Sequence, residues 1–176
     1  PEHDSYWEPI RFDGKYGNVK SNVYILAGWF DLFTKQNLKN FEKVTEHAKA
    51  HAGQSPHRVI VGPWAHGGYG NSELGDLDFG GDAAVNSTDI MLRWFDTHLK
   101  GIDSGIEDEP PVRIFVMGDN EWRYENEWPL ARTEYTKYYF HSGGNANTKN
   151  GDGALSTVQP GKETADTFTY NPADPV

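Results

Sequence analysis

Two short apolar runs, joined by one amphipathic segment, constrain the fold of this chain more than any other feature. The first run, residues 23–27, ends at a glycine and is followed by Asp31. The second, residues 57–61, also ends at a glycine and is followed by His66. Nearly continuous apolar runs of this length are typical of parallel strands that are buried on both faces. The sequence therefore predicts a parallel sheet with one ionisable residue just past each of two strand ends.

The segment between the two runs has the period of a helix. From residue 34 to about residue 51, apolar side chains recur at three- and four-residue steps before Gly53: Leu38, Phe41, Val44 and Ala48. Strand, helix and strand make a βαβ unit, whose crossover is expected to be right-handed. Ligand sites in such sheets lie off the C-terminal strand ends. We therefore expect Asp31 and His66 to emerge at the same edge of the sheet.

A glycine-rich loop and a second helix are predicted next. Residues 67–82 contain two glycine clusters beside the histidine and form a candidate rim of the site. Residues 86–100 carry a helical apolar face, with Ser87 or Thr88 as the N-cap. Gly101 suits the left-handed position that often follows the end of a helix.

The pattern changes after residues 103–111, whose acids, glycines and prolines are typical of a domain junction. The later apolar runs are separated by turn signals and show no helical period: 112–116, 136–140 and 167–170. We predict an α/β domain over residues 1–109 and the beginning of an all-β domain over residues 110–176.

Composition excludes several classes of function. The formal net charge is -10, from 26 acidic residues against 16 Lys and Arg, which argues against a groove that follows nucleic-acid phosphates. The chain has no cysteine, so disulfides, thiolate metal sites and thiol nucleophiles are excluded, although the compartment stays open. No apolar run approaches the roughly 20 residues that cross a bilayer. The chain begins without Met or a leader and is expected to be a piece of a longer protein.

Metal sites are not predicted. His47 and His51 lie four residues apart on the first helix, but the Glu of the zincin motif does not follow the first His. The acidic groups at 76–78 and 103–108 do not match the ligand spacing of an EF-hand loop, and solvated acids are the simpler interpretation.

Asp31 and His66 fit two of the three positions of a serine hydrolase. Such an enzyme needs a base that takes the serine proton and a buried carboxylate that holds the imidazole in the right tautomer. In α/β-hydrolases the chain order is Ser, Asp or Glu, then His, so a C-terminal half keeps the last two. No Gly-x-Ser-x-Gly occurs in these 176 residues. The simpler alternatives are a turn or N-cap carboxylate for Asp31 and a loop histidine for His66.

Several motifs together resemble the C-terminal part of the X-Pro dipeptidyl-peptidase and cocaine-esterase-like hydrolases. The resemblance covers nearly the whole chain. It is carried by these blocks: Gly-Trp-Phe-Asp at 28–31, Gly-Pro-Trp-Ala-His-Gly at 62–67, Arg-Trp-Phe-Asp at 93–96, Leu-Lys-Gly at 99–101, Pro-Val-Arg-Ile-Phe-Val-Met-Gly at 111–118, Trp-Arg at 122–123 and Glu-Trp-Pro-Leu at 127–130.

The resemblance implies a fold, two catalytic residues and a substrate class. Asp31 matches the triad acid and His66 the triad base. The fold would be the C-terminal part of an α/β-hydrolase domain followed by the start of a jelly-roll sandwich. The serine, the helical cap and a Tyr of the oxyanion hole would lie upstream. The parent protein would hydrolyse an acyl ester, an amide or an X-Pro peptide without a cofactor, and this chain alone is expected to be inactive. The alternative is a non-catalytic scaffold or binding module that keeps the hydrolase fold.

The aromatic residues allow two interpretations. Trp29 and Trp64, beside the catalytic candidates, either line a substrate pocket or pack in the core. Four others are expected to join the two domains: Trp94, Phe95, Trp122 and Trp128. Apolar faces that meet the missing N-terminal half of the same protein would be exposed in this chain alone. We therefore expect a homo-oligomer, a copurifying partner chain or poor solubility.

Overall fold

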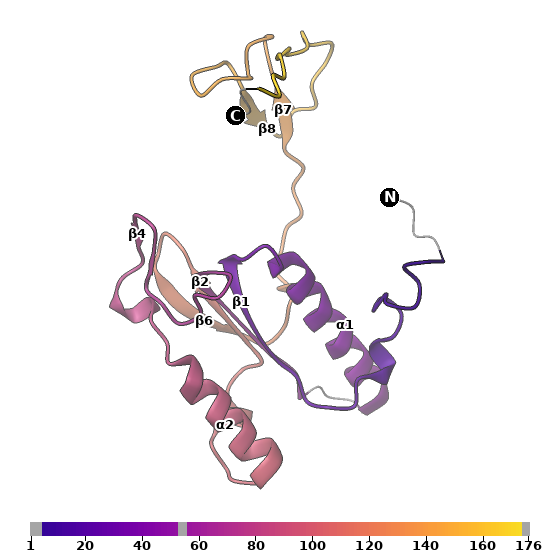
Figure 1. The fold of residues 1–176 in the computed structure, drawn as a ribbon, viewed down its shortest axis with the longest axis vertical. Coiled ribbons are helices and arrows are strands. Elements are labelled where there is room, and N and C mark those ends of the chain that lie inside the picture. Colours follow the sequence, from indigo (N-terminus) through magenta and orange to yellow (C-terminus); the bar gives the residue numbers. More distant parts are fainter. Residues whose placement is uncertain (1–4, 53–55, 174–176) are drawn as a thin grey trace. The chain divides into compact units, whose positions relative to one another are not determined.

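The computed structural model describes residues 5–52 and 56–173. The chain divides into two compact units between Ala131 and Arg132. Gly53, predicted to end the first helix, lies outside the described residues. The elements of the first unit are η1 Tyr16–Asn18, β1 Tyr24–Phe30, α1 Thr34–Ala52, β2 Arg58–Ala65, β3 Glu73–Leu74, β4 Leu77–Asp78, η2 Gly81–Ala83, α2 Ser87–Lys100, η3 Ile106–Asp108, β5 Val112–Val116 and β6 Glu121–Glu125 (Figure 1). Those of the second are β7 Tyr139–His141 and β8 Ala154–Ser156.

The first unit is built on a mixed four-stranded sheet in the order β1-β2-β5-β6. β1 and β2 are parallel and joined by α1, which confirms the predicted βαβ unit. β5 pairs with β2 in parallel and β6 pairs with β5 in antiparallel. The run at 112–116, interpreted from sequence as the first strand of an all-β domain, thus adds to the α/β sheet. The predicted boundary at residue 109 does not coincide with the division between the compact units.

Both faces of β2 are covered, which explains its continuous apolar sequence. Val59 and Val61 share a cluster with Leu38 and Phe41 of α1. Ile60, which points to the opposite face, packs with Ile90 of α2. The sheet therefore lies between the two helices, and its central strand is buried along nearly its whole length.

The N-cap of the second helix lies immediately before the two predicted candidates. Asn86 is the N-cap, and its side-chain oxygen accepts a hydrogen bond of 3.1 Å from the backbone N–H of Asp89. Ser87 and Thr88 are the first two helical residues, so the prediction that one of them caps the helix was wrong. Gly101 has a φ of 68° and donates its N–H to the Thr97 carbonyl, which confirms its predicted left-handed role.

Over its described residues, 132–173, the second unit contains one antiparallel pair, β7 and β8, with Tyr139 opposite Ser156. The predicted strand at 136–140 is found as the shorter β7, which starts three residues later and ends one residue later. The alternating segment at 167–170 forms no strand, and Phe168 is 82% exposed. Alternation predicts a strand only where a neighbouring backbone is available for pairing.

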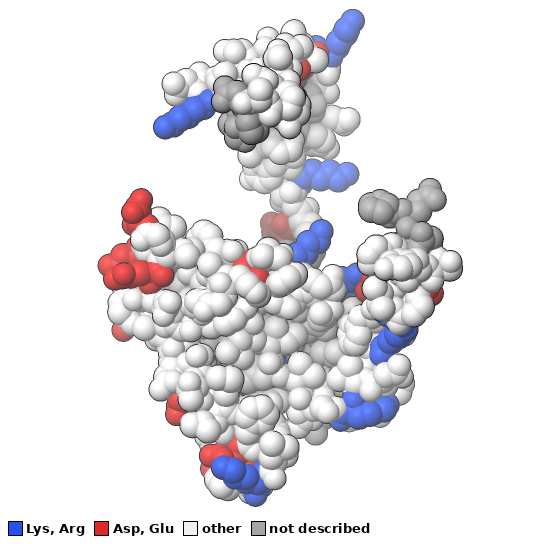
Figure 2. All heavy atoms as spheres, in the orientation of Figure 1, with Lys and Arg blue, Asp and Glu red and all other residues white. Residues whose placement is uncertain are grey.

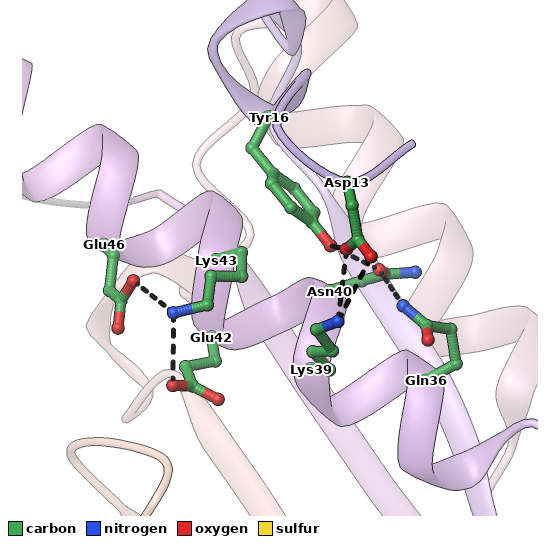
Figure 3. A network of polar contacts seen from close by, with 8 residues as sticks. All are labelled: Asp13, Tyr16, Gln36, Lys39, Asn40, Glu42, Lys43 and Glu46. Atoms are coloured by element: carbon green, nitrogen blue, oxygen red, sulfur yellow. Dashed lines mark hydrogen bonds and ion pairs between the residues drawn. The ribbon is translucent and has the colours of Figure 1, made fainter. Parts of the chain in front are cut away.

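Polar contacts link residues 13–16, at the start of η1, to α1 (Figure 3). The Tyr16 hydroxyl lies within hydrogen-bond distance of Asp13 Oδ1 and of Asn40 Oδ1, 3.2 Å from each, and Lys39 pairs with Asp13 over 3.2 Å. On the face drawn in Figure 2, acidic side chains gather around the β3–β4 hairpin. Within the described residues, no helix is both long enough and apolar enough to span a membrane.

Candidate active site

The turn that follows β1 fixes Asp31 in a buried position. Its N–H donates to the Gly28 carbonyl over 2.9 Å, and its own carbonyl accepts the Thr34 hydroxyl over 2.8 Å. The backbone N–H of Phe33 donates to Asp31 Oδ1 over 2.9 Å, which is an Asx-type turn contact. One carboxylate oxygen is thus occupied by the local backbone, as the simple turn interpretation expects, and the other is left for a more distant partner.

Glycines allow the ends of β1 and β2 to approach closely. The Trp64 indole folds back over Gly62, where an added Cβ would lie 2.3 Å from the ring. A Cβ at Gly28 would lie 2.1 Å from the Trp64 carbonyl oxygen. Trp64 is held by a 2.9 Å hydrogen bond from its indole N–H to the Asn71 carbonyl. This packing directs the chain after Trp64 toward the turn that holds Asp31.

The two predicted residues meet at this edge. His66 Nδ1 lies 3.2 Å from Asp31 Oδ2. The Asp31 side chain is fully buried, whereas that of His66 is 59% exposed. The Phe33 ring contacts the imidazole edge-on, with ring centres 5.4 Å apart. No residue in 5–52 or 56–173 makes a hydrogen bond to Nε2, so that nitrogen is available to an incoming group.

Tyr69 is a third member of the site that sequence reasoning missed. Its hydroxyl donates to Asp31 Oδ2 over 2.6 Å, the same oxygen that His66 contacts. Residues 67–82 were predicted to form a rim of the site, but no residue of the loop was singled out. The available signal was a tyrosine three residues after the histidine, within a glycine-rich segment that allows sharp turns.

The hydrogen bonds keep the carboxylate ionised. The hydroxyl of Tyr69 and the backbone N–H of Phe33 lower the pKa of Asp31 below its ordinary value; burial opposes them, and His66 adds a smaller lowering. Burial, followed by the contact with Asp31, raises the pKa of Tyr69 to about 12. At neutral pH the site therefore holds a carboxylate and a protonated phenol. A buried carboxylate facing an imidazole favours the imidazolium that forms during general-base catalysis.

Trp29 and Trp64 lie in packing positions. Trp64 is 1% exposed and belongs to the cluster with Ile60 and Ile90. Trp29 is half-buried, its indole N–H donates to the Phe115 carbonyl over 2.7 Å, and its ring lies 6.3 Å from that of Trp128. Their contribution to a substrate pocket stays a prediction.

The described ranges contain no group of three or more His, Cys, Asp or Glu residues arranged to hold a metal ion. His47 and His51 stack with ring centres 3.9 Å apart. Nδ1 of His51 lies 2.8 Å from the His47 carbonyl, which engages that nitrogen with the backbone of the helix.

Two protein-family models match the chain. Residues 1–68 match the X-Pro dipeptidyl-peptidase (S15 family) model, and residues 104–175 match that of the X-Pro dipeptidyl-peptidase C-terminal non-catalytic domain. The first match contains both Asp31 and His66.

Individual relatives agree with the family models. A cocaine esterase from Rhodococcus sp. is 39% identical over 179 residues, covering 100% of this chain and 30% of the relative. A putative Xaa-Pro dipeptidyl-peptidase from Bacillus cereus is 26% identical over 72% of this chain and 19% of the relative. The solved structure of an alpha-amino acid ester hydrolase superposes with a TM-score of 0.63 at 25% identity, over 92% of this chain and 26% of that one. The chain thus spans less than a third of the length of these proteins.

Proposed function

The chain belongs to the X-Pro dipeptidyl-peptidase and cocaine-esterase-like family of serine hydrolases, and on that basis we propose that it supplies the Asp and His of a catalytic triad. One observation carries the proposal. A fully buried carboxylate, Asp31, holds Nδ1 of an exposed imidazole, His66, at the C-terminal ends of two parallel strands. The nucleophilic serine would come from a part of the protein outside these 176 residues.

In the proposed mechanism, His66 Nε2 takes the proton of the serine hydroxyl as the oxygen attacks the substrate carbonyl carbon. The imidazolium then gives this proton to the leaving alcohol or amine as its bond to the carbonyl carbon breaks. Water, activated by the same nitrogen, hydrolyses the acyl-serine and regenerates the free serine. Asp31 stays ionised throughout and holds the ring in the tautomer whose Nε2 carries the lone pair.

We propose three substrate classes: acyl esters, amides and X-Pro peptides. The names of the matched proteins, an esterase and a dipeptidyl-peptidase, support the first and the last. The residues that select among the three would lie upstream, together with the helical cap and the oxyanion-hole tyrosine. We keep Trp29 and Trp64 as proposed walls of the acyl pocket, since they flank the two catalytic candidates in sequence. No cofactor takes part in the proposed reaction.

We further propose that residues 1–109 are the C-terminal portion of an α/β-hydrolase domain and residues 110–176 the start of a jelly-roll sandwich. The parallel strands with flanking helices support the first part, and the family match of residues 104–175 supports the second. The pairing of β5 with β2 counts against a boundary as early as residue 109.

The missing N-terminal half is the proposed main partner of this chain. Several apolar side chains of α2 are at least 43% exposed, which supports a contact with another segment or another copy: Met91, Leu92, Phe95 and Leu99. An oligomer or a copurifying chain is therefore expected when the 176 residues are produced alone.

A second candidate function is a non-catalytic scaffold or binding module. It is favoured for the C-terminal part, because the model that matches residues 104–175 describes a non-catalytic domain. It predicts that His66 can be replaced without chemical consequence, which separates it from the enzyme proposal.

The deciding experiment labels the full-length protein with a fluorophosphonate probe and locates the adduct by mass spectrometry. We expect one adduct, on a serine outside the 176 residues. His66→Gln should slow labelling on the order of a thousandfold, because the serine loses its base. His51→Gln, an exposed histidine of α1, is the matched control and should label at the wild-type rate. Equal rates in the two variants would support the scaffold and contradict the enzyme.

A further inference from the structure

Asp31 Oδ2 accepts two hydrogen bonds, and the one from outside the Asp–His pair is the shorter. Tyr69 donates to this oxygen over 2.6 Å, whereas His66 Nδ1 lies 3.2 Å away. With Phe33 N–H on Oδ1, the carboxylate is held at both oxygens by groups other than the imidazole. Its plane is therefore fixed even when the exposed imidazole moves.

Tyr69 is itself held in place. Its ring meets that of Trp64 edge-on, with centres 6.0 Å apart, and packs against the cluster that joins the sheet to α2. The next residue, Gly70, accepts a 3.0 Å hydrogen bond from the Val85 N–H. Gly70 has a φ of 98°, and a Cβ there would lie 2.4 Å from the Val85 carbonyl oxygen. The loop thus presents the phenol from a fixed backbone.

We propose that Tyr69 is a positioning residue of the Asp31–His66 pair, whose hydroxyl shares Oδ2 with the imidazole and so limits how strongly the carboxylate holds the imidazolium. A second donor on the same oxygen withdraws charge density that would otherwise face Nδ1. The phenol also keeps the carboxylate aligned before the imidazolium forms. The inference rests on the proposed function, since it assigns a role within the same triad.

The test compares Tyr69→Phe with wild type in the full-length protein, using the rate of fluorophosphonate labelling as a function of pH. Phenylalanine keeps the ring that packs on Trp64 and removes only the hydroxyl. Without this donor the carboxylate favours the imidazolium more strongly. We therefore expect the acid limb of the profile to move to higher pH by about half a unit, with a few-fold lower plateau because the carboxylate is less well aligned.

Tyr16→Phe is the matched control. It also removes a tyrosine hydroxyl that contacts an aspartate, Asp13, but in the separate polar network between residues 13–16 and α1 (Figure 3). Its labelling profile should match that of wild type at every pH. If loss of the hydroxyl of Tyr69 acted only through stability, labelling would fall by the same factor across the profile and the acid limb would stay in place, which would overturn the proposal.

A second variant keeps the test decisive if Tyr69→Phe is poorly folded. Site-specific replacement of Tyr69 by 3-fluorotyrosine keeps the hydroxyl and makes it a stronger donor, so the acid limb should move to lower pH. A shift in the other direction, or none, would contradict the proposal. Failure of the whole triad assignment gives a different result, namely wild-type labelling in His66→Gln.

Discussion

Each unit of the chain pairs the Nδ1 of a histidine with a carboxylate, but the two pairs distribute burial in different ways. In the first unit the Asp31 side chain is fully buried and that of His66 is 59% exposed. In the second, His141 Nδ1 lies 2.7 Å from Glu163 Oε1, and the two side chains are 22% and 33% exposed. Only the first arrangement combines a carboxylate shielded from water with an imidazole that an incoming group can reach.

The second ring nitrogen separates the two histidines more clearly. Nε2 of His141 lies 3.0 Å from the Val158 carbonyl and 2.9 Å from the Ser156 hydroxyl. Ser156, His141 and Glu163 therefore have the residue types of a triad. A carbonyl oxygen can only accept, however, so Nε2 is engaged as a donor and is not available as a base. The comparison shows that a serine, histidine and acid in contact do not make a nucleophile unless Nε2 is left to accept a proton.

The largest expected effect comes from removing the carboxylate of each pair in turn, with Asp31→Asn in the first unit and Glu163→Gln in the second. In Asp31→Asn, Oδ1 still accepts from Phe33, while the amide nitrogen can replace Oδ2. That nitrogen donates, so Nδ1 of His66 has to accept from it. The ring proton then lies on Nε2, which can no longer take a proton from the serine. Hydrolysis of p-nitrophenyl acetate by the full-length protein should fall about 10⁴-fold with the fold intact. Glu163→Gln should leave it unchanged, and near-normal turnover in Asp31→Asn would refute the role of Asp31.

The next largest effect is expected from Gly62→Ala, which tests what places His66 opposite Asp31. The new methyl group would lie 2.3 Å from the Trp64 ring, so the indole or the end of β2 has to shift. We expect a loss of about 1–3 kcal/mol of unfolding free energy, as for an overpacked core, and this loss is measured by urea denaturation. We also expect slower fluorophosphonate labelling of the full-length protein. Gly81→Ala is the control, because its added Cβ would meet open space. If both variants behave like wild type, the close approach of Trp64 does not position the site.

How much of this site the sequence could predict depends on the range of each interaction. Asp31 and His66 were identified because the βαβ rule brings the C-terminal ends of parallel strands to one edge, whatever the length of the connection. Tyr69 was missed because its contact depends on the path of an irregular loop, fixed here by Trp64 and by the backbone at Gly70. No local pattern encodes that path.

The same distinction applies to the fold. The helices and the first two strands could be predicted because their hydrophobic periodicity involves residues that are close together in the sequence. The place of Val112–Val116 in the sheet does not, since its alternating sequence suits either an antiparallel or a parallel neighbour and its partner, Val59 to Val61, is about 50 residues away. The N-cap was assigned one or two residues late because Asn86, Ser87 and Thr88 are all good caps, and only backbone geometry selects among them.

The smallest expected effect concerns the pair in the second unit and its dependence on pH. The contact with His141, and after it the Ser142 N–H, lowers the pKa of Glu163 below its ordinary value of 4.5. A carboxylate whose pKa is lower in the folded state stabilises the fold above its ordinary pKa, and this contribution is lost as pH falls through the folded value. The contribution of Glu163 should therefore be present above pH 4.5 and be lost as the pH falls below 4.5 through the lower folded value.

Hydrogen exchange at the β7 and β8 amides, corrected for intrinsic rates, measures this contribution. Wild-type protection should exceed that of Glu163→Gln by about two- to threefold at pH 5, as for a partly exposed ion pair, and the difference should shrink at about pH 3. Comparing wild type and variant at each pH cancels the effect of the neighbouring Asp152 and Asp166, which are present in both. A difference that grows as the pH falls would mean that the protonated form of Glu163 stabilises the unit, and His141 would then not be clamped by an ion pair. Nδ1 of His141 would in that case accept from the protonated Glu163 while Nε2 still donates to the Val158 carbonyl, so the contrast with His66 would rest on Nε2 alone.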